Sequence, residues 1–421
     1  MLFDPARHEP LSSAAWDEAR ARGTIERIVR AAESAYDDGW PMHPLDADGE
    51  ARVPVHCLYF GACGVIWALR YLEAVGAVSL RRSYADDVER LLPRNRAWLA
   101  SFGSFDFPSY LMGDTAILML QRWIDPHARV LDELERLVAG NLDNPARELM
   151  WGSPGTMLAA LFLHECTGEA RWAELFRQTA RKLASQLRHS RECDCDYWTQ
   201  DMYGRTSTYI DAVHGFVGTA LPLIRGRHLL DEGAWSAWEA RIVKTVSHTA
   251  IREGSLANWP AWLSPETRDR PLLMQYCHGA PGFIVCLAEF PGAALDALLL
   301  SGAEAIWSAG PLRKGSNLCH GTAGNGYAFL KLYERTRDVR WLERARAFAM
   351  HAIAQFEADT ERYGQMRYSL WTGDLGLAIY LYDCIAGRAR FPTMDVFFAG
   401  DVTPSAGTPT AHDAFARTPS R

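Results

Sequence analysis

The chain lacks the features that mark membrane proteins and disulfide-rich secreted proteins. No continuously apolar run approaches the roughly 20 residues needed to span a bilayer, and the N-terminus has no apolar stretch typical of a secretory signal. Its nine cysteines are odd in number and follow no disulfide framework spacing. These absences predict a cytoplasmic protein whose thiols are free for burial or for metal binding.

The chain also lacks blocks of charge of one sign. Its 44 Lys and Arg are interspersed among 51 Asp and Glu, which gives a formal net charge of −7. Such a balance predicts no nucleic-acid partner and no attachment to an anionic membrane. With 48% hydrophobic and 23% charged residues in a chain of 421, the composition is that of a globular protein with a sizeable core.

What the chain does contain is a repeated small-residue turn. Six GxxG turns and a degenerate seventh begin at Gly61, Gly113, Gly152, Gly215, Gly279, Gly321 and Gly373. Each turn precedes a stretch that is apolar on nearly all sides, such as VIWALRYL at 65–72, and this is typical of an interior helix. Glycine is expected in these turns because it adopts positive φ freely and lets helices approach closely.

The segments that follow the inner helices are amphipathic. In 342–356, apolar residues recur at helical spacing while charged residues lie off that stripe. The repeating unit is therefore a glycine turn, an inner helix, a loop and an outer helix, and copies must stack to bury their apolar faces. This predicts an all-α fold, a double-layered α/α toroid (barrel) of seven helical hairpins with GxxG-type turns. An open superhelix is the structural alternative.

The repeat also suggests the domain organisation. Residues 51–398 are expected to form a single toroid domain, preceded by an N-terminal helical lead-in at 1–50. Residues 399–421 are rich in Pro, Thr, Ser, Gly and Ala, which predicts a disordered tail. The segment 193–201, with two cysteines, is predicted to be a loop near the mouth of the barrel and not a second metal site.

Three consecutive turns carry histidine immediately before the first glycine. These are His214, His278 and His320, and the last two are preceded by Cys277 and Cys319. If equivalent turns point to one end of a ring, the side chains converge there, and Cys and neutral His are the usual zinc ligands. The residues alone leave two geometries open. Four ligands would close a structural site, whereas two Cys and one His would leave one position for water or substrate.

These motifs resemble the lanthionine synthetase C-like family over nearly the whole chain. The motifs that carry the resemblance are QYCHGAPG (275–282), LCHGTAG (318–324), AVHGFVG (212–218), ELMWGSPG (148–155) and ARFP (389–392). The resemblance implies one Zn²⁺ ion on Cys277, Cys319 and His320, with the fourth position open. His278 then lies beside the metal rather than on it.

The resemblance also implies a chemistry, the addition of a thiol to dehydroalanine or dehydrobutyrine to form a thioether. Bacterial cyclases of the family use a cysteine of the same peptide, whereas the eukaryotic-like members add glutathione. His214 resembles the acid/base histidine of the family and Glu148 its acidic partner. Lys314 matches a lysine that could stabilise the enolate oxygen. His278 and Tyr276 are expected to contact substrate.

Two departures favour the glutathione-adding branch. Leu273 stands where ring-forming cyclases tend to carry arginine, and the first motif reads CHG where they commonly have CYG. The expected partners are glutathione or a cysteine-containing peptide, and a dehydrated peptide or protein. One alternative is a non-catalytic zinc- and glutathione-binding sensor or interaction protein. Another is a carbohydrate-active α/α toroid that uses Glu148 and Asp114 as a carboxylate pair, although it does not account for two CHG motifs.

Overall fold

The computed structural model describes residues 1–46, 54–101, 103, 107–264 and 271–400. The described residues form α1 (Glu18–Ser34), α2 (Ala62–Ala74), α3 (Ala85–Ser101), α4 (Asp114–Ile124), α5 (Leu131–Gly140), α6 (Ser153–Thr167), α7 (Ala170–Ser185), α8 (Phe216–Arg225), α9 (Glu232–Thr249), α10 (Ala280–Leu287), α11 (Asp296–Ala309), α12 (Thr322–Thr336), α13 (Val339–Tyr363) and α14 (Asp374–Ala386). Two short 3-10 helices lie at Pro5–Arg7 and Arg227–Leu229. None of the described helices combines the length and the apolar character that crossing a membrane requires.

Three short antiparallel hairpins interrupt the helices. They are formed by β1 (Arg188–Ser190) with β2 (Cys195–Tyr197), β3 (Gln200–Met202) with β4 (Arg205–Ser207), and β5 (Ile251–Glu253) with β6 (Leu256–Asn258). Apart from these hairpins the elements are helices, so the predicted helical character is confirmed for most of the described residues. The segment 193–201, predicted to be a loop, instead contributes to β1–β2 and β3–β4.

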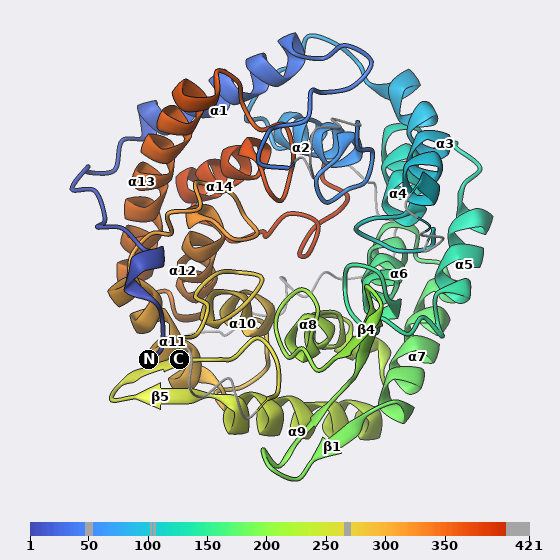
Figure 1. The fold of residues 1–421 in the computed structure, drawn as a ribbon. Helices are drawn as coiled ribbons and strands as arrows, with labels where there is room; N and C mark the ends of the chain where they lie inside the picture. Colours follow the sequence, from blue (N-terminus) through green and yellow to red (C-terminus); the bar gives the residue numbers. More distant parts are fainter. Residues whose placement is uncertain (47–53, 102, 104–106, 265–270, 401–421) are drawn as a thin grey trace, which may run out of the picture.

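The helices lie in two layers around a common centre (Figure 1). The even-numbered helices form the inner layer. Each of them contacts the next along the chain, and α14 contacts α2. The odd-numbered helices lie outside them, with α7 against α6, α11 against α10 and α13 against α12. Helix α1, which comes from the predicted lead-in, packs on the outside of α14.

The burial of each layer follows the sequence pattern. On the inner helix α12, the run from Thr322 to Leu332 is buried without interruption. On the outer helix α13, burial is confined to one stripe, and the predicted apolar positions all lie on it: Leu342, Ala345, Phe348, Ala349, Ala352 and Phe356. Burial of apolar surface on both layers stabilises the arrangement, because neither layer can remove that surface from water alone.

All seven predicted turns lie at the same structural position, with the first glycine at the N-cap of an inner helix. The expectation of positive φ is wrong for most of these glycines. Only Gly279 has it, at 111°, while the others are extended. Close approach explains the second glycines. A Cβ there would collide with the carbonyl oxygen six residues earlier, at Gly64, Gly155, Gly218, Gly282, Gly324 and Gly376.

Main-chain hydrogen bonds join the turns to one another at one end of the inner layer. The bonds run from Tyr59 N to Leu111 O (3.0 Å), Leu111 N to Met150 O (3.4 Å), Leu149 N to Val213 O (3.2 Å), Cys277 N to Cys319 O (3.0 Å), Cys319 N to Trp371 O (2.9 Å) and Trp371 N to Tyr59 O (3.0 Å). Residues at the same phase of the repeat are thereby held beside each other, although they are far apart in the chain.

The segment after α14 runs back through the centre of the arrangement (Figure 1). Its main-chain oxygens accept hydrogen bonds from inner-layer side chains, including Tyr110 to Thr393 (2.7 Å) and Trp67 to Phe397 (2.9 Å). Phe391 is fully buried and stacks on Tyr276 at 4.5 Å. This segment therefore packs beneath the turns. The predicted disordered tail lies outside the described residues apart from 399 and 400.

Candidate metal and acid–base site

The two cysteines of the CHG motifs lie together at the turn end. Their main chains are bonded directly, and both side chains are buried. The thiol of Cys277 donates a hydrogen bond to Cys319, which holds the pKa of Cys319 well below its ordinary value against the opposing effect of burial. The pKa of Cys277 is raised, first by burial and then by the same bond.

Further polar groups surround this thiol pair. The hydroxyl of Tyr59 donates to Cys319 Sγ at 2.7 Å, and the His320 side chain also bonds to Cys319. The side-chain amide of Gln275 donates to Cys277 Sγ at 3.0 Å. Hydrogen bonds of this kind favour the charged form of a thiol. The environment is therefore one in which a thiolate is stabilised.

The donor set of this cluster fits zinc in kind. Cys277 and Cys319 supply two sulfurs in mutual contact, and the imidazole of His320 is bonded to one of them, which is the ligand chemistry that zinc prefers. Across the part of the chain that the structure describes, no three His, Cys, Asp or Glu side chains already form a group that could hold a metal ion. Donor chemistry and proximity therefore carry the zinc prediction.

His214 and Glu148 form a buried acid–base pair. The two side chains meet at 2.9 Å between His214 Nδ1 and Glu148 Oε2. Glu148 is fully buried and also accepts hydrogen bonds from the main-chain amides of Met150 (2.9 Å) and Trp151 (2.6 Å), so its position is defined. Because a carboxylate only accepts hydrogen bonds, Nδ1 carries the proton and Nε2 is left for chemistry. His214 keeps 18% of its side chain exposed.

The pKa of His214 is raised above its ordinary value. Burial by itself lowers the pKa, but the hydrogen bond and charge of Glu148 outweigh it, with smaller contributions from the charges of Asp211 and Cys319. The imidazolium therefore persists to higher pH than in a free histidine. The stabilisation that the ion pair gives the fold is complete below the unfolded pKa of about 6.5 and is lost as pH rises through the folded pKa.

Replacing Glu148 with Gln is expected to lower the pKa of His214, because a buried opposite charge that favours the imidazolium is removed. The measurement is an NMR titration of the labelled histidine. Asp211→Asn provides the matched control. It should lower the pKa of His214 by less, since the hydrogen bond of Asp211 to His214 goes to the main-chain amide and not to the imidazole. An unchanged His214 pKa in Glu148→Gln would show that Glu148 does not control this histidine.

His278 is held by a second carboxylate in the same way. Its Nδ1 lies 2.6 Å from Asp211 Oδ2, and Asp211 is fully buried. The other oxygen of Asp211 accepts the main-chain amides of Val213 (3.1 Å) and His214 (2.7 Å). Each histidine thus bonds the carboxylate of the preceding turn. The repeat produces two histidine–carboxylate pairs in sequence around the turn end.

The ring of Tyr209 lies against both histidines. Its centroid is 5.5 Å from that of His214 and 6.2 Å from that of His278, with which it stacks. His278 directly follows Cys277 in the chain. The two histidine–carboxylate pairs and the thiol pair therefore lie on neighbouring turns at the same end of the inner helices.

Lys314 and Tyr276, which were also predicted as site residues, lie outside the groups described so far. Lys314 lines a small polar pocket with His43, Asp359 and Arg367. Asn317 bonds both the Lys314 carbonyl (3.1 Å) and the His320 amide (3.0 Å). Tyr276 is fully buried. Its stacked position beneath the turns leaves it no exposed surface with which to contact substrate.

Sequence reasoning missed Tyr59 and Asp211. Tyr59 stands two residues before the first glycine of its turn, the phase that Cys277 and Cys319 occupy. Asp211 stands four residues before Gly215, the phase of Glu148. The repeat phase could therefore have identified both, had it been applied to every turn and not only to the histidines.

The carboxylate pair required by the carbohydrate-active alternative is not supported. Asp114 is fully buried and bonds Arg96 at 2.5 Å, whereas Glu148 is committed to His214 and to two main-chain amides. The two carboxylates thus have separate partners. An acid and a base acting across one glycosidic bond would have to face a common space.

Comparisons with known proteins agree with this arrangement. The family model described as lanthionine synthetase C-like protein matches residues 55–396. The fold is similar to that of nisin cyclase, with a TM-score of 0.63 over 91% of this chain and 98% of the other, at 16% identity. At that identity the likeness concerns the fold alone.

Two curated relatives match shorter regions. Glutathione S-transferase LANCL1 of Danio rerio is 39% identical over 132 residues, which is 30% of this chain and 32% of the relative. LanC-like protein GCL1 of Arabidopsis thaliana is 32% identical over 145 residues, 31% of this chain and 32% of the relative. The matched regions thus span about a third of each relative's length.

Proposed function

Because the chain belongs to the lanthionine synthetase C-like family, we propose that it is an enzyme that adds a thiol to dehydroalanine or dehydrobutyrine residues. The product is a thioether, the reaction depends on zinc, and glutathione is the preferred thiol. The acceptor is a dehydrated peptide or protein supplied by another enzyme.

One observation carries the proposal, the gathering of a thiol pair and a histidine–carboxylate pair at one end of the inner helices. Cys277 bonds Cys319 through the main chain, and Tyr209 connects the histidine that follows Cys277 to His214. Thiol addition to an activated double bond needs both groups, one to bind and ionise the nucleophile and one to deliver a proton.

Cys277, Cys319 and His320 would hold the zinc ion, with the fourth position open. Bound there, zinc would favour the thiolate form of an incoming thiol, which is the nucleophilic form. The residues around the cluster support this role, because Tyr59 and Gln275 already donate hydrogen bonds to the two sulfurs. Such outer contacts orient metal ligands and tune their basicity.

His214 would supply the proton that completes the addition. The thiolate sulfur forms a bond to the β-carbon, the π electron pair moves to the α-carbon as an enolate, and His214 Nε2 delivers a proton to that carbon. The proton released by the incoming thiol restores the imidazolium. The raised pKa of His214 supports this assignment, since it keeps the acid form present near neutral pH.

His278 is proposed to contact the acceptor, because its ring is 21% exposed while Asp211 fixes its orientation. Lys314 remains a prediction for stabilising the enolate oxygen. It would have to act from the neighbouring polar pocket, where His43 and Arg367 also lie.

The choice of glutathione has two supports. A relative that is 39% identical over 132 residues carries the name glutathione S-transferase, and Leu273 and His278 depart from the ring-forming pattern. We also infer that residues 51–398 form one closed α/α toroid of seven hairpins. The contact of α14 with α2 and of α1 with α14 supports this.

The test is incubation of the zinc-loaded protein with glutathione and a dehydroalanine-containing peptide, followed by mass spectrometry. The expected product is the peptide plus one glutathione, and a chelator should prevent its formation. Full zinc loading without any adduct would contradict the catalytic proposal and favour a zinc- and glutathione-binding sensor.

A further inference from the structure

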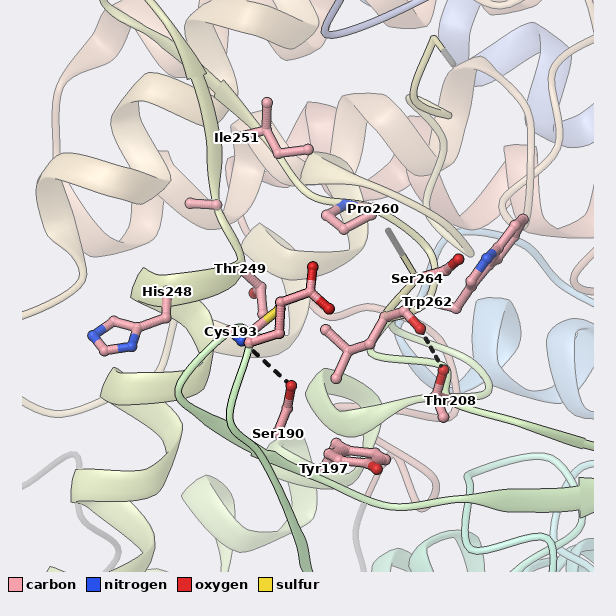
Figure 2. Close-up of a pocket in the computed structure, with 13 residues that line it drawn as sticks. Ser190, Cys193, Tyr197, Thr208, His248, Thr249, Ile251, Pro260, Trp262 and Ser264 are labelled. Atoms are coloured by element: carbon pink, nitrogen blue, oxygen red, sulfur yellow. Dashed lines mark hydrogen bonds between the residues drawn. The ribbon is translucent and has the colours of Figure 1, made fainter. Parts of the chain in front are cut away.

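A cavity of about 410 Å³ lies outside the groups described above. Four parts of the chain line it, namely the β1–β2 hairpin, Thr208 after β4, the end of α9 continuing into β5, and the stretch 260–264 (Figure 2). A volume of this size is typical of sites that hold a small ligand or several side chains of a peptide.

Apolar and aromatic residues make up about half of the lining of this cavity, and polar residues the other half. Tyr197, Ile251, Trp262 and Leu263 contribute rings and aliphatic groups, while Glu192 and His248 are the acidic and basic side chains in the lining. The side chain of His248 bonds the main-chain oxygen of Asp194 at 2.9 Å. Trp262 is 42% exposed, so part of its ring is accessible to a ligand.

Neither lysine nor arginine occurs among the residues that line this cavity. Glutathione carries two carboxylates, and binding them away from water would require cationic partners. The lining instead matches an uncharged stretch of polypeptide, with apolar side chains against the rings and main-chain groups near the hydroxyls of Thr208 and Ser264.

The cavity and the histidine site share one wall. Leu263 N donates to the Thr208 oxygen at 2.9 Å, and the Thr208 hydroxyl returns a bond of 2.8 Å to the Leu263 oxygen. The next residues along the chain, Tyr209 and Trp262, form an antiparallel bridge, and their ring centroids are 6.0 Å apart. Tyr209 then stacks on His278 at 6.2 Å. The ring of Tyr209 therefore lies between Trp262, in the lining of the cavity, and His278.

We propose that this cavity is the docking site for the acceptor polypeptide, holding an uncharged, apolar segment beside the dehydroamino acid. The inference rests on the proposed function for the identity of the ligand. The path from Trp262 through Tyr209 to His278 corresponds to about three to four residues of extended chain. The apolar side chain that fills the cavity thus stands three or four positions from the reacting residue.

Binding of a defined peptide tests the proposal independently of turnover. The probe is a fluorescein-labelled, uncharged ten-residue peptide with a central dehydroalanine and a leucine three positions to each side. It is titrated into the zinc-loaded, full-length protein and followed by anisotropy. Trp262→Ala is expected to weaken binding about tenfold or more. Trp235→Ala, a half-buried tryptophan at the other end of α9, serves as the matched control and should bind like the wild type.

Cysteine alkylation gives a second readout that needs no substitution. Cys193 lines the cavity, whereas Cys166 is a partly exposed cysteine on α6. Saturating peptide should slow iodoacetamide modification of Cys193 at least about threefold and leave Cys166 unchanged. Protection of Cys193 by glutathione alone would overturn the proposal, because the cavity would then hold the thiol substrate.

The outcomes separate this inference from the catalytic one. If the peptide binds and Trp262→Ala weakens that binding, but no glutathione adduct forms, the docking site is supported and the proposed reaction is contradicted. If the adduct forms but wild type and Trp262→Ala bind the peptide equally, only the docking proposal is contradicted. Failure of the peptide to bind the wild-type protein also overturns the docking proposal.

Discussion

Cys319→Ala is expected to remove bound zinc and to reduce formation of the glutathione adduct by more than about a hundredfold. Loss of an outer-shell contact to a metal ligand typically costs about 10–100-fold in affinity or activity, and loss of a ligand itself should cost more. Cys319 also receives the hydrogen bonds of Tyr59, Cys277 and His320. Its removal therefore leaves three polar groups without their common partner.

Metal analysis and mass spectrometry of the product check this prediction together. Cys63→Ala provides a matched control, since Cys63 is also fully buried but lies on α2 away from the CHG motifs. That variant is expected to lose some stability through a small cavity, with zinc content and adduct formation retained. A zinc content of Cys319→Ala equal to that of the wild type would contradict the ligand assignment.

Gly324→Ala is expected to destabilise the fold by about 2–3 kcal/mol, because the added methyl group has no space. A Cβ at this position collides with the main-chain oxygen of Leu318, which cannot move aside as a flexible side chain would. The turn also carries Cys319 and His320, so any shift that relieves the collision displaces both. We therefore expect lowered zinc affinity along with the lower stability.

Urea or thermal unfolding of the zinc-free and zinc-loaded forms measures this effect. The contrasting variant is Gly23→Ala on the exposed face of α1, where an added Cβ meets nothing within 4 Å. It should stabilise the protein by about 0.5–1 kcal/mol, since alanine is the better helix former. Equal unfolding midpoints for Gly324→Ala and the wild type would show that the turn can widen without cost.

Much of the fold was accessible from the sequence because its repeat is regular. The glycine turns marked the start of every inner helix, and the apolar stripe of 342–356 predicted which face of α13 is buried. Of the two reasons expected for the glycines, positive φ is wrong for most of them, whereas close approach is confirmed. Their φ angles are mostly extended, and what excludes a side chain is the main chain folding back on itself, which no local sequence rule reveals.

The candidate site was partly accessible for the same reason. Phase in the repeat brought Cys277, Cys319 and the three histidines into one prediction, and the 2.9 Å contact between His214 and Glu148 agrees with the partnership that the family resemblance implied. Asp211 occupies the same repeat position as Glu148, but only the structure shows that it bonds His278. The hairpins around the cavity lie in inserted segments that carry no repeat pattern.

The sequence by itself determined the helical repeat, the position of each turn and the residue types gathered at the turn end. These are consequences of local periodicity and backbone sterics, which act between residues close in the chain. Only the tertiary structure decided which turns are bonded to which, how His214 and His278 each meet the carboxylate of the preceding turn, and that Trp262 and Tyr209 connect a cavity to the site. Those contacts join residues far apart in the chain, and they depend on how the helical layers pack around their common centre.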